Sequence, residues 1–223
     1  MSWDMSILYH SKKQLCFTFF CLLITLYSNG QYQHLLHKSY AENIHNLQNM
    51  YTNLIAIKDT SKINQNINKI KQFAKSNNDK SLELEINLFS IYYTIEYRDK
   101  CSSDCVSSLI KIINEANTYQ LKPIRIRAIR VLADYYWSKI RNYELAFEQY
   151  ILLGKEIGTI SYTDYPEKHR DLNMIGQSYY VFRDYKQAEY YLNRILELPE
   201  DDSNIMFMNA ARNTLGLCYQ KTR

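Results

Sequence analysis

Apolar residues recur at helical spacing along the chain, most clearly in the stretch Arg170–Glu200. Its first half places an apolar residue every three or four positions, which is one stripe of a helix: Leu172, Ile175, Tyr179 and Phe182. Its second half carries another stripe, which ends before Pro199: Ala188, Tyr191, Leu192, Ile195 and Leu198. Only the segment 183–185 separates the halves. We therefore predict two antiparallel helices joined by a tight turn.

The same pattern divides the rest of the chain into helices joined by short polar breaks. Further stripes at helical spacing occupy residues 44–55, 63–74, 82–97, 106–113, 129–136, 146–157 and 208–219. Residues 82–97 carry two stripes at once, so we expect that helix to be buried on two sides. We predict four hairpins beginning near residues 41, 81, 124 and 168, and a fifth unit beginning near 204. The period is about 40–44 residues.

Parts of the chain also repeat in residue type, at separations of 40 and 42 positions. A tyrosine and an alanine of the third hairpin recur in the fourth, and a glycine and a tyrosine of the fourth recur in the fifth unit. The residues that define this repeat are Tyr143, Ala146, Gly176, Tyr179, Tyr185, Ala188, Gly216 and Tyr219. Gly176 and Ala188 are small residues at places where the two helices of a hairpin would approach closely.

The order and spacing of Gly176, Tyr179, Asp184, Tyr185 and Ala188 resemble a tetratricopeptide repeat (TPR) unit. The specific likeness covers roughly residues 129–223, and the period is longer than the usual ~34 residues. The resemblance implies an all-α, right-handed superhelical solenoid of antiparallel helix hairpins for residues 31–223. It also implies a binding scaffold for a protein or peptide, with no enzymatic activity and no cofactor.

Three positions depart from the family pattern. Asp134 stands at the glycine position of the third hairpin, Leu172 replaces the usual aromatic residue of the fourth, and Arg183 replaces its turn glycine. These changes affect the expected local packing more than the existence of the hairpins.

In such arrays the first helix of each hairpin lines a concave groove. The resemblance places six side chains of the fourth and fifth units on that side: Asn173, Gln177, Tyr180, Asn213, Leu217 and Gln220. Amide and phenol groups of this kind can hydrogen-bond an extended peptide. An ordinary polar helix face is the alternative explanation of the same residues.

Residues 1–30 have the layout of a secretory signal peptide. Lys12 and Lys13 precede the apolar run Leu15–Tyr27, and Ser28 and Gly30 are small residues before Gln31. The run is shorter than the ~20 residues that a membrane-spanning helix needs. We therefore expect an exported protein, periplasmic or extracytoplasmic, which touches a membrane only through residues 15–27 if they are not cleaved. An uncleaved anchor or a buried N-terminal helix is the alternative, and Met5 is a second candidate start.

The five cysteines do not indicate a metal site. Cys101 and Cys105 are four residues apart at the start of a predicted helix, where export permits a local disulfide, and two free thiols are the alternative. No histidine lies near them in sequence to complete a metal site. Cys218 falls on an apolar stripe, so we predict that it is a core residue.

Charge and motifs give little support for nucleic-acid binding or catalysis. The formal net charge is +4, too weak and too scattered to indicate nucleic acid. We find no glycine-rich phosphate loop, no His-Glu-x-x-His and no Gly-x-Ser-x-Gly. Arg125, Arg127 and Arg130 form the only local basic cluster. We interpret it as a solvated helix start balanced by nearby acids, with contact to an acidic ligand as the alternative.

The last predicted stripe ends at Lys221-Thr222-Arg223 with no partner helix after it. We therefore expect either a chain that continues beyond this point or an array capped by a single helix. Exported TPR arrays of this composition also resemble the extracytoplasmic sensor half of membrane-anchored bacterial regulators. On that alternative, the sensor would be followed by a membrane helix and an output domain.

Overall fold

The computed structural model describes residues 30–98, 101 and 103–222, and every regular element in this part of the chain is a helix. A short 3-10 helix, Gln33–Leu35, comes first. The α-helices are α2 (Tyr40–Ala56), α3 (Thr60–Ser76), α4 (Lys80–Tyr97), α5 (Ser103–Thr118), α6 (Lys122–Asp134), α7 (Tyr143–Gly158), α8 (Lys168–Val181), α9 (Tyr185–Leu196) and α10 (Ile205–Thr222). A π-helix, η2 (Tyr135–Ile140), follows α6 directly.

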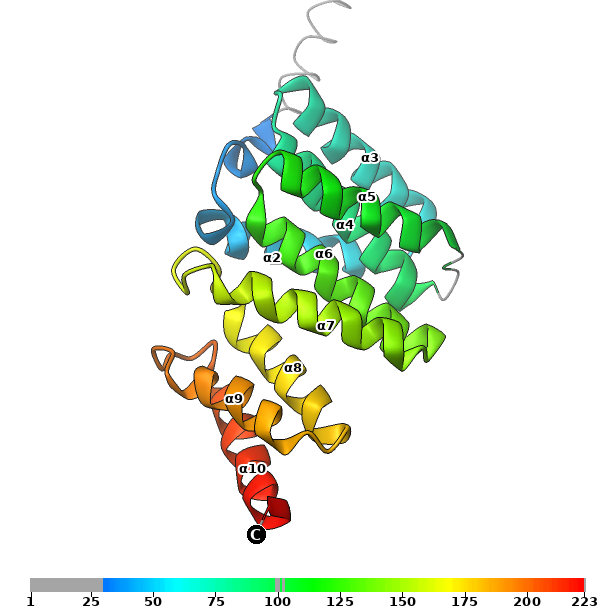
Figure 1. Cartoon of the computed structure of the whole chain (residues 1–223). Coiled ribbons are helices and arrows are strands. Elements are labelled where there is room, and N and C mark those ends of the chain that lie inside the picture. The colour runs from blue at the N-terminus through cyan, green and yellow to red at the C-terminus, as the bar shows by residue number, and fades with distance from the viewer. Residues whose placement is uncertain (1–29, 99–100, 102, 223) are drawn as a thin grey trace, which may run out of the picture.

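The prediction of an all-α protein is confirmed for the described residues. The helices that open the successive hairpins are α2, α4, α6, α8 and α10, and each begins within two residues of the predicted start. Successive helices pack against their neighbours in the chain, from α3 and α5 near one end of Figure 1 to α10 at the other.

Short polar residues at the breaks explain why most of these helices begin where they do. Such a side chain accepts a hydrogen bond from a backbone N–H of the first turn, which has no partner inside the helix. The residues that do so are Ser39, Asp59, Asp79, Asn142 and Asp184. At Ser39 the bond is reciprocal, because Glu42 accepts from the Ser39 backbone N–H at 2.9 Å.

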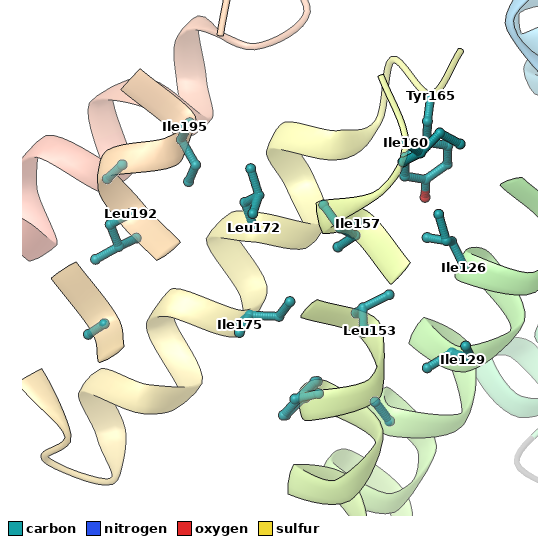
Figure 2. Close-up of a cluster of buried hydrophobic side chains, with 14 of the residues drawn as sticks. Ile126, Ile129, Leu153, Ile157, Ile160, Tyr165, Leu172, Ile175, Leu192 and Ile195 are labelled. Carbon is teal, nitrogen blue, oxygen red and sulfur yellow. The ribbon is translucent and has the colours of Figure 1, made fainter. Parts of the chain in front are cut away.

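The predicted apolar stripes form three buried clusters that follow one another along the fold. The first joins α2, α3 and α4, and the second joins α4, α5 and α6. The third runs from α6 to α10, and Figure 2 shows its side chains pointing inward from α6, α7, α8 and α9. As expected, α4 is buried on two sides, because its residues belong to both the first and the second cluster.

Candidate functional site

A group of charged side chains is buried where α4, α6 and the start of α8 meet. Arg127 and Arg130 extend from α6. Arg127 pairs with Glu85 of α4, and Arg130 donates from Nη1 to Asp171 Oδ1 of α8 at 3.0 Å. Glu167 lies between the two arginines, with its Oε2 at 3.5 Å from Arg127 Nε and 3.7 Å from Arg130 Nη1. These pairs tie together three hairpins that are distant in sequence.

Two tyrosines of α2 complete this charged group. The Tyr40 hydroxyl donates to Glu167 Oε2 at 2.6 Å, and the Tyr51 hydroxyl donates to Glu85. The Arg127 guanidinium also lies over the Tyr40 ring, 5.0 Å from its centre. Side chains of α2, in the first hairpin, therefore contact both Glu85 of the second hairpin and Glu167 just before the fourth.

Electrostatics keep the central carboxylate ionised. Burial by itself would raise the pKa of Glu167, but the charges of Arg130 and Arg127 outweigh burial and lower the pKa to about 2. Both arginines also remain charged, because the neighbouring carboxylates raise their pKa despite burial. Glu167, Arg127 and Arg130 are therefore buried ions at neutral pH.

Two atoms of this group are buried without a hydrogen-bond partner: Glu85 Oε2 and Arg127 Nε. Buried polar atoms in folded proteins almost always have a partner, supplied by the protein, by water or by a ligand. The fold therefore leaves hydrogen-bonding capacity unused beside Arg127.

A cavity of about 170 Å³ lies beside these ions. Its walls come from the opening helices of the first four hairpins and the segment just before α8. The lining includes the aromatic residues Tyr51, Phe89 and Tyr92, and the rings of Tyr51 and Phe89 stack with centres 4.3 Å apart. Arg127 and Arg130 also line the cavity.

A larger and more open cavity of about 740 Å³ adjoins the first. The two share Ile44 and Gln48 of α2, together with Glu167 and Arg170. The larger cavity lies between α2 and the loops that precede α8 and α10. We call this larger cavity the groove and the smaller one the inner cavity.

The interpretation of the arginine cluster as a solvated helix start is wrong for Arg127 and Arg130. Arg130 is only 6% exposed, and the Arg127 side chain is 12% exposed. Only Arg125 forms a peripheral pair, with Glu156 at 3.1 Å. Arg127 and Arg130 lie three positions apart, which puts them on one face of α6. That spacing is the feature of the sequence that could have predicted a shared environment for the two side chains.

Asn173, Gln177 and Tyr180 are predicted to lie on a concave binding face. All three are half-buried on α8, and none lines the groove or the inner cavity. Gln177 donates from Nε2 to the Thr214 hydroxyl of α10 at 2.6 Å. The Tyr180 ring packs against Tyr185, with centres 5.8 Å apart. The side-chain oxygen of Asn173 is buried without a hydrogen-bond partner. Gln177 and Tyr180 thus make contacts within the fold.

The three residues predicted on α10, Asn213, Leu217 and Gln220, are exposed and also lie outside both cavities. The inner cavity is instead lined mainly by α2, α4 and α6, and the groove mainly by α2 and the loops before α8 and α10. The resemblance is weakest in the first two hairpins, so it offered no guide to the side chains of α2 and α4.

The residues that define the repeat fall into two groups. Ala146, Gly176 and Ala188 are buried at helix contacts, and Tyr179 and Tyr185 are half-buried. Tyr143, Gly216 and Tyr219 are exposed. A Cβ on Gly176 would lie 2.7 Å from the Leu192 side chain, whereas a Cβ on Gly216 would meet nothing within 4 Å.

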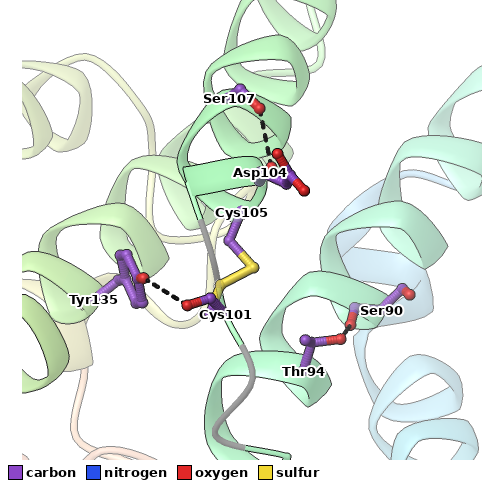
Figure 3. The surroundings of a disulfide bond; sticks show 7 residues. All are labelled: Ser90, Thr94, Cys101, Asp104, Cys105, Ser107 and Tyr135. Atoms are coloured by element: carbon purple, nitrogen blue, oxygen red, sulfur yellow. Dashed lines mark hydrogen bonds between the residues drawn. A yellow bond between two sulfur atoms is a disulfide. The ribbon is translucent and has the colours of Figure 1, made fainter.

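Cys101 and Cys105 form a disulfide at the start of α5 (Figure 3). The Tyr135 hydroxyl donates to the Cys101 carbonyl oxygen at 3.4 Å. The third described cysteine, Cys218, is buried in the cluster that runs from α6 to α10, as expected from its stripe.

The described residues contain no group of three or more His, Cys, Asp or Glu side chains placed to hold a metal ion. No helix within residues 30–98 and 103–222 is long and apolar enough to cross a bilayer. The apolar run Leu15–Tyr27 lies outside the described residues. No family model, no curated protein and no solved structure matches this chain.

Proposed function

We propose that this protein is an exported, non-enzymatic scaffold, a TPR-like solenoid that binds a protein or peptide in the groove. The observation that carries the proposal is the groove itself. It is open, holds about 740 Å³, and runs between α2 and the loops before α8 and α10.

The lining of the groove suits an extended chain. His45 and Gln48 of α2 and Asp202 of the loop before α10 are exposed and supply hydrogen-bonding side chains. Pro166 and Phe207 are half-buried and supply apolar surface for a side chain of the partner. A peptide needs both kinds of contact, because its backbone must be hydrogen-bonded and its side chains provide selectivity.

A phage-displayed library of random peptides tests this function. We expect peptides to be enriched on the purified protein and to lose at least tenfold in affinity on the variant Gln48→Trp, whose added bulk obstructs the groove beside α2. Gln65→Trp is the matched control, because Gln65 is exposed on α3 and lines neither cavity. Failure to enrich any peptide, or equal binding to both variants, contradicts the proposal.

Export is part of the proposal, and the disulfide Cys101–Cys105 supports it, because such bonds persist in oxidising compartments. We expect protein recovered from the cell envelope to begin at or near Gln31 and to have a non-reduced mass lower by two hydrogens. Intact mass measured with and without reductant checks both points. A chain that retains residues 1–30 would contradict cleavage of the predicted signal.

A further inference from the structure

The inner cavity has the size and walls of a site for a small apolar group. Its volume of about 170 Å³ is close to that of an apolar cavity of about 150 Å³ that holds benzene in another protein. Tyr51, Phe89 and Tyr92 contribute aromatic rings to its lining, and Leu88 and Val131 add aliphatic side chains.

The charged residues that line the inner cavity favour an anion. They are Arg127, Arg130 and Arg170, against the single carboxylate of Glu167. Glu85 and Asp171 are not among the lining residues, and each holds one Nη1 of an arginine. A bound anion would therefore meet more cations than carboxylates at the cavity wall.

The arginines have hydrogen-bond donors to spare. Among the described residues, Arg127 and Arg130 donate only through Nη1, although each guanidinium carries five N–H groups. Arg127 Nε is buried and has no hydrogen-bond partner, and Glu167 Oε2 lies 3.5 Å from it. A planar guanidinium matches a carboxylate in geometry, because two parallel N–H groups meet two oxygens.

We propose that the inner cavity binds a carboxylate carried on an apolar group about the size of one ring. The carboxylate contacts Arg127, Arg130 and Arg170, and the apolar group lies among Tyr51, Phe89 and Tyr92. The apolar walls disfavour a phosphate, which would present only charge to them. Access is from the groove, through the shared and exposed residues Gln48 and Arg170.

Two sources supply this chemistry: a free organic acid, and the C-terminal residue of a peptide. The free acid does not depend on the proposed peptide binding. Peptides displayed at the N-terminus of a phage coat protein have no free C-terminal carboxylate, so the library experiment and the present proposal can fail separately.

Calorimetric titration of the purified protein with a matched set of probes tests the proposal. We expect saturable binding of phenylacetate, and at least tenfold weaker binding of phenylacetamide, which lacks the charge, and of acetate, which lacks the ring. A hexapeptide ending in phenylalanine, with a free or an amidated C-terminus, identifies the second source. Binding of the free-acid peptide alone supports the same chemistry with a peptide as its source.

The variant Arg170→Gln is expected to weaken phenylacetate binding by about three- to tenfold. Arg212→Gln is the matched control, because the two side chains are similarly exposed, 47% and 50%, and each pairs with a glutamate. Thermal melting of both variants checks folding. The proposal is overturned if acid and amide bind equally, if no probe binds, so that water alone fills the cavity, or if both variants bind as the parent does.

Discussion

The third and fourth hairpins, α6–α7 and α8–α9, share a turn and differ in how their helices meet. Arg141 and Arg183 lie 42 positions apart, and both adopt a left-handed backbone, with φ of 58° and 63°. The next residues, Asn142 and Asp184, each accept a backbone N–H at 3.1 Å and begin the second helix. The two turns thus share a left-handed residue and the side chain after it that caps the next helix.

The helix contact just before the turn is different. In the fourth hairpin Gly176 lies against Leu192, and a Cβ at Gly176 would be only 2.7 Å from that side chain. In the third hairpin the equivalent positions hold Asp134 and Tyr150. Burial raises the pKa of Tyr150, and the charge of Asp134 raises it further. The helices of the fourth hairpin therefore approach closely because Gly176 has no side chain. In the third hairpin the Asp134 carboxylate lies near the buried phenol of Tyr150.

The end of the first helix also differs. In the third hairpin the segment Tyr135–Ile140 is a π-helix, and the turn closes with a bond from Asn142 N to Tyr136 O at 2.9 Å. In the fourth, the corresponding bond runs from Asp184 N to Tyr179 O at 3.0 Å, one residue shorter. The comparison shows that a turn is set by adjacent residues, whereas a helix contact depends on the pair of side chains that meet there.

The largest expected effect on stability comes from placing an aspartate, the residue at position 134 of the third hairpin, at the equivalent position 176 of the fourth. Gly176→Asp should destabilise the protein by about 3 kcal/mol or more, because it overpacks the contact with Leu192 and buries a charge. Gly216→Asp is the matched control in open space and should stay within about 0.5 kcal/mol. Urea unfolding measures both. Equal effects would mean that the two glycines are in equivalent surroundings.

Asp134→Asn should stabilise the protein at pH 7.5 by about 1–3 kcal/mol. Burial raises the pKa of Asp134 to about 6, partly offset by Arg130, so the charged form is disfavoured in the folded state. The cost in the parent protein is fully present above pH 6. It is lost as pH falls toward and below the unfolded value of 3.8, so most of the gain should be absent at pH 4. Urea unfolding at both pH values measures this.

Asp202→Asn serves as the control for that series, because Asp202 is exposed, and it should change the free energy of unfolding by no more than about 0.5 kcal/mol. A loss of stability in Asp134→Asn at every pH would show that the carboxylate makes stabilising contacts, and would remove this difference between the hairpins.

The smallest expected effect tests the shared turn. Arg141→Gly and Arg183→Gly should each stabilise the protein by about 0.5 kcal/mol. The left-handed conformation costs a non-glycine residue about 1–2 kcal/mol, and the greater freedom of glycine in the unfolded chain offsets part of the gain. Arg183→Ala retains the backbone cost and should show no gain. If only one of the two glycine variants had a raised melting temperature, the two turns would differ in the cost of their left-handed residue.

The sequence by itself determined the helices and their ends. Apolar residues every three or four positions define each helix, and residues such as Asp59 and Asp184 begin the next one. Both signals act between neighbours in the chain, so they can be read without knowing the fold. The turn at Arg183 is of the same kind, since an asparagine or aspartate follows the left-handed residue in both hairpins.

Only the tertiary structure decided where the cavities lie and what the charges do. The sequence alone predicts a surface position for Arg127. Its burial depends on Glu85, 42 positions earlier, and on Glu167, 40 positions later. Tyr40 reaches Glu167 over a separation of 127 positions. No local pattern records such meetings, because they result from the way α2 lies against α4, α6 and the start of α8. A buried charged side chain is stable only when the fold brings a residue of opposite charge, distant in sequence, into contact with it.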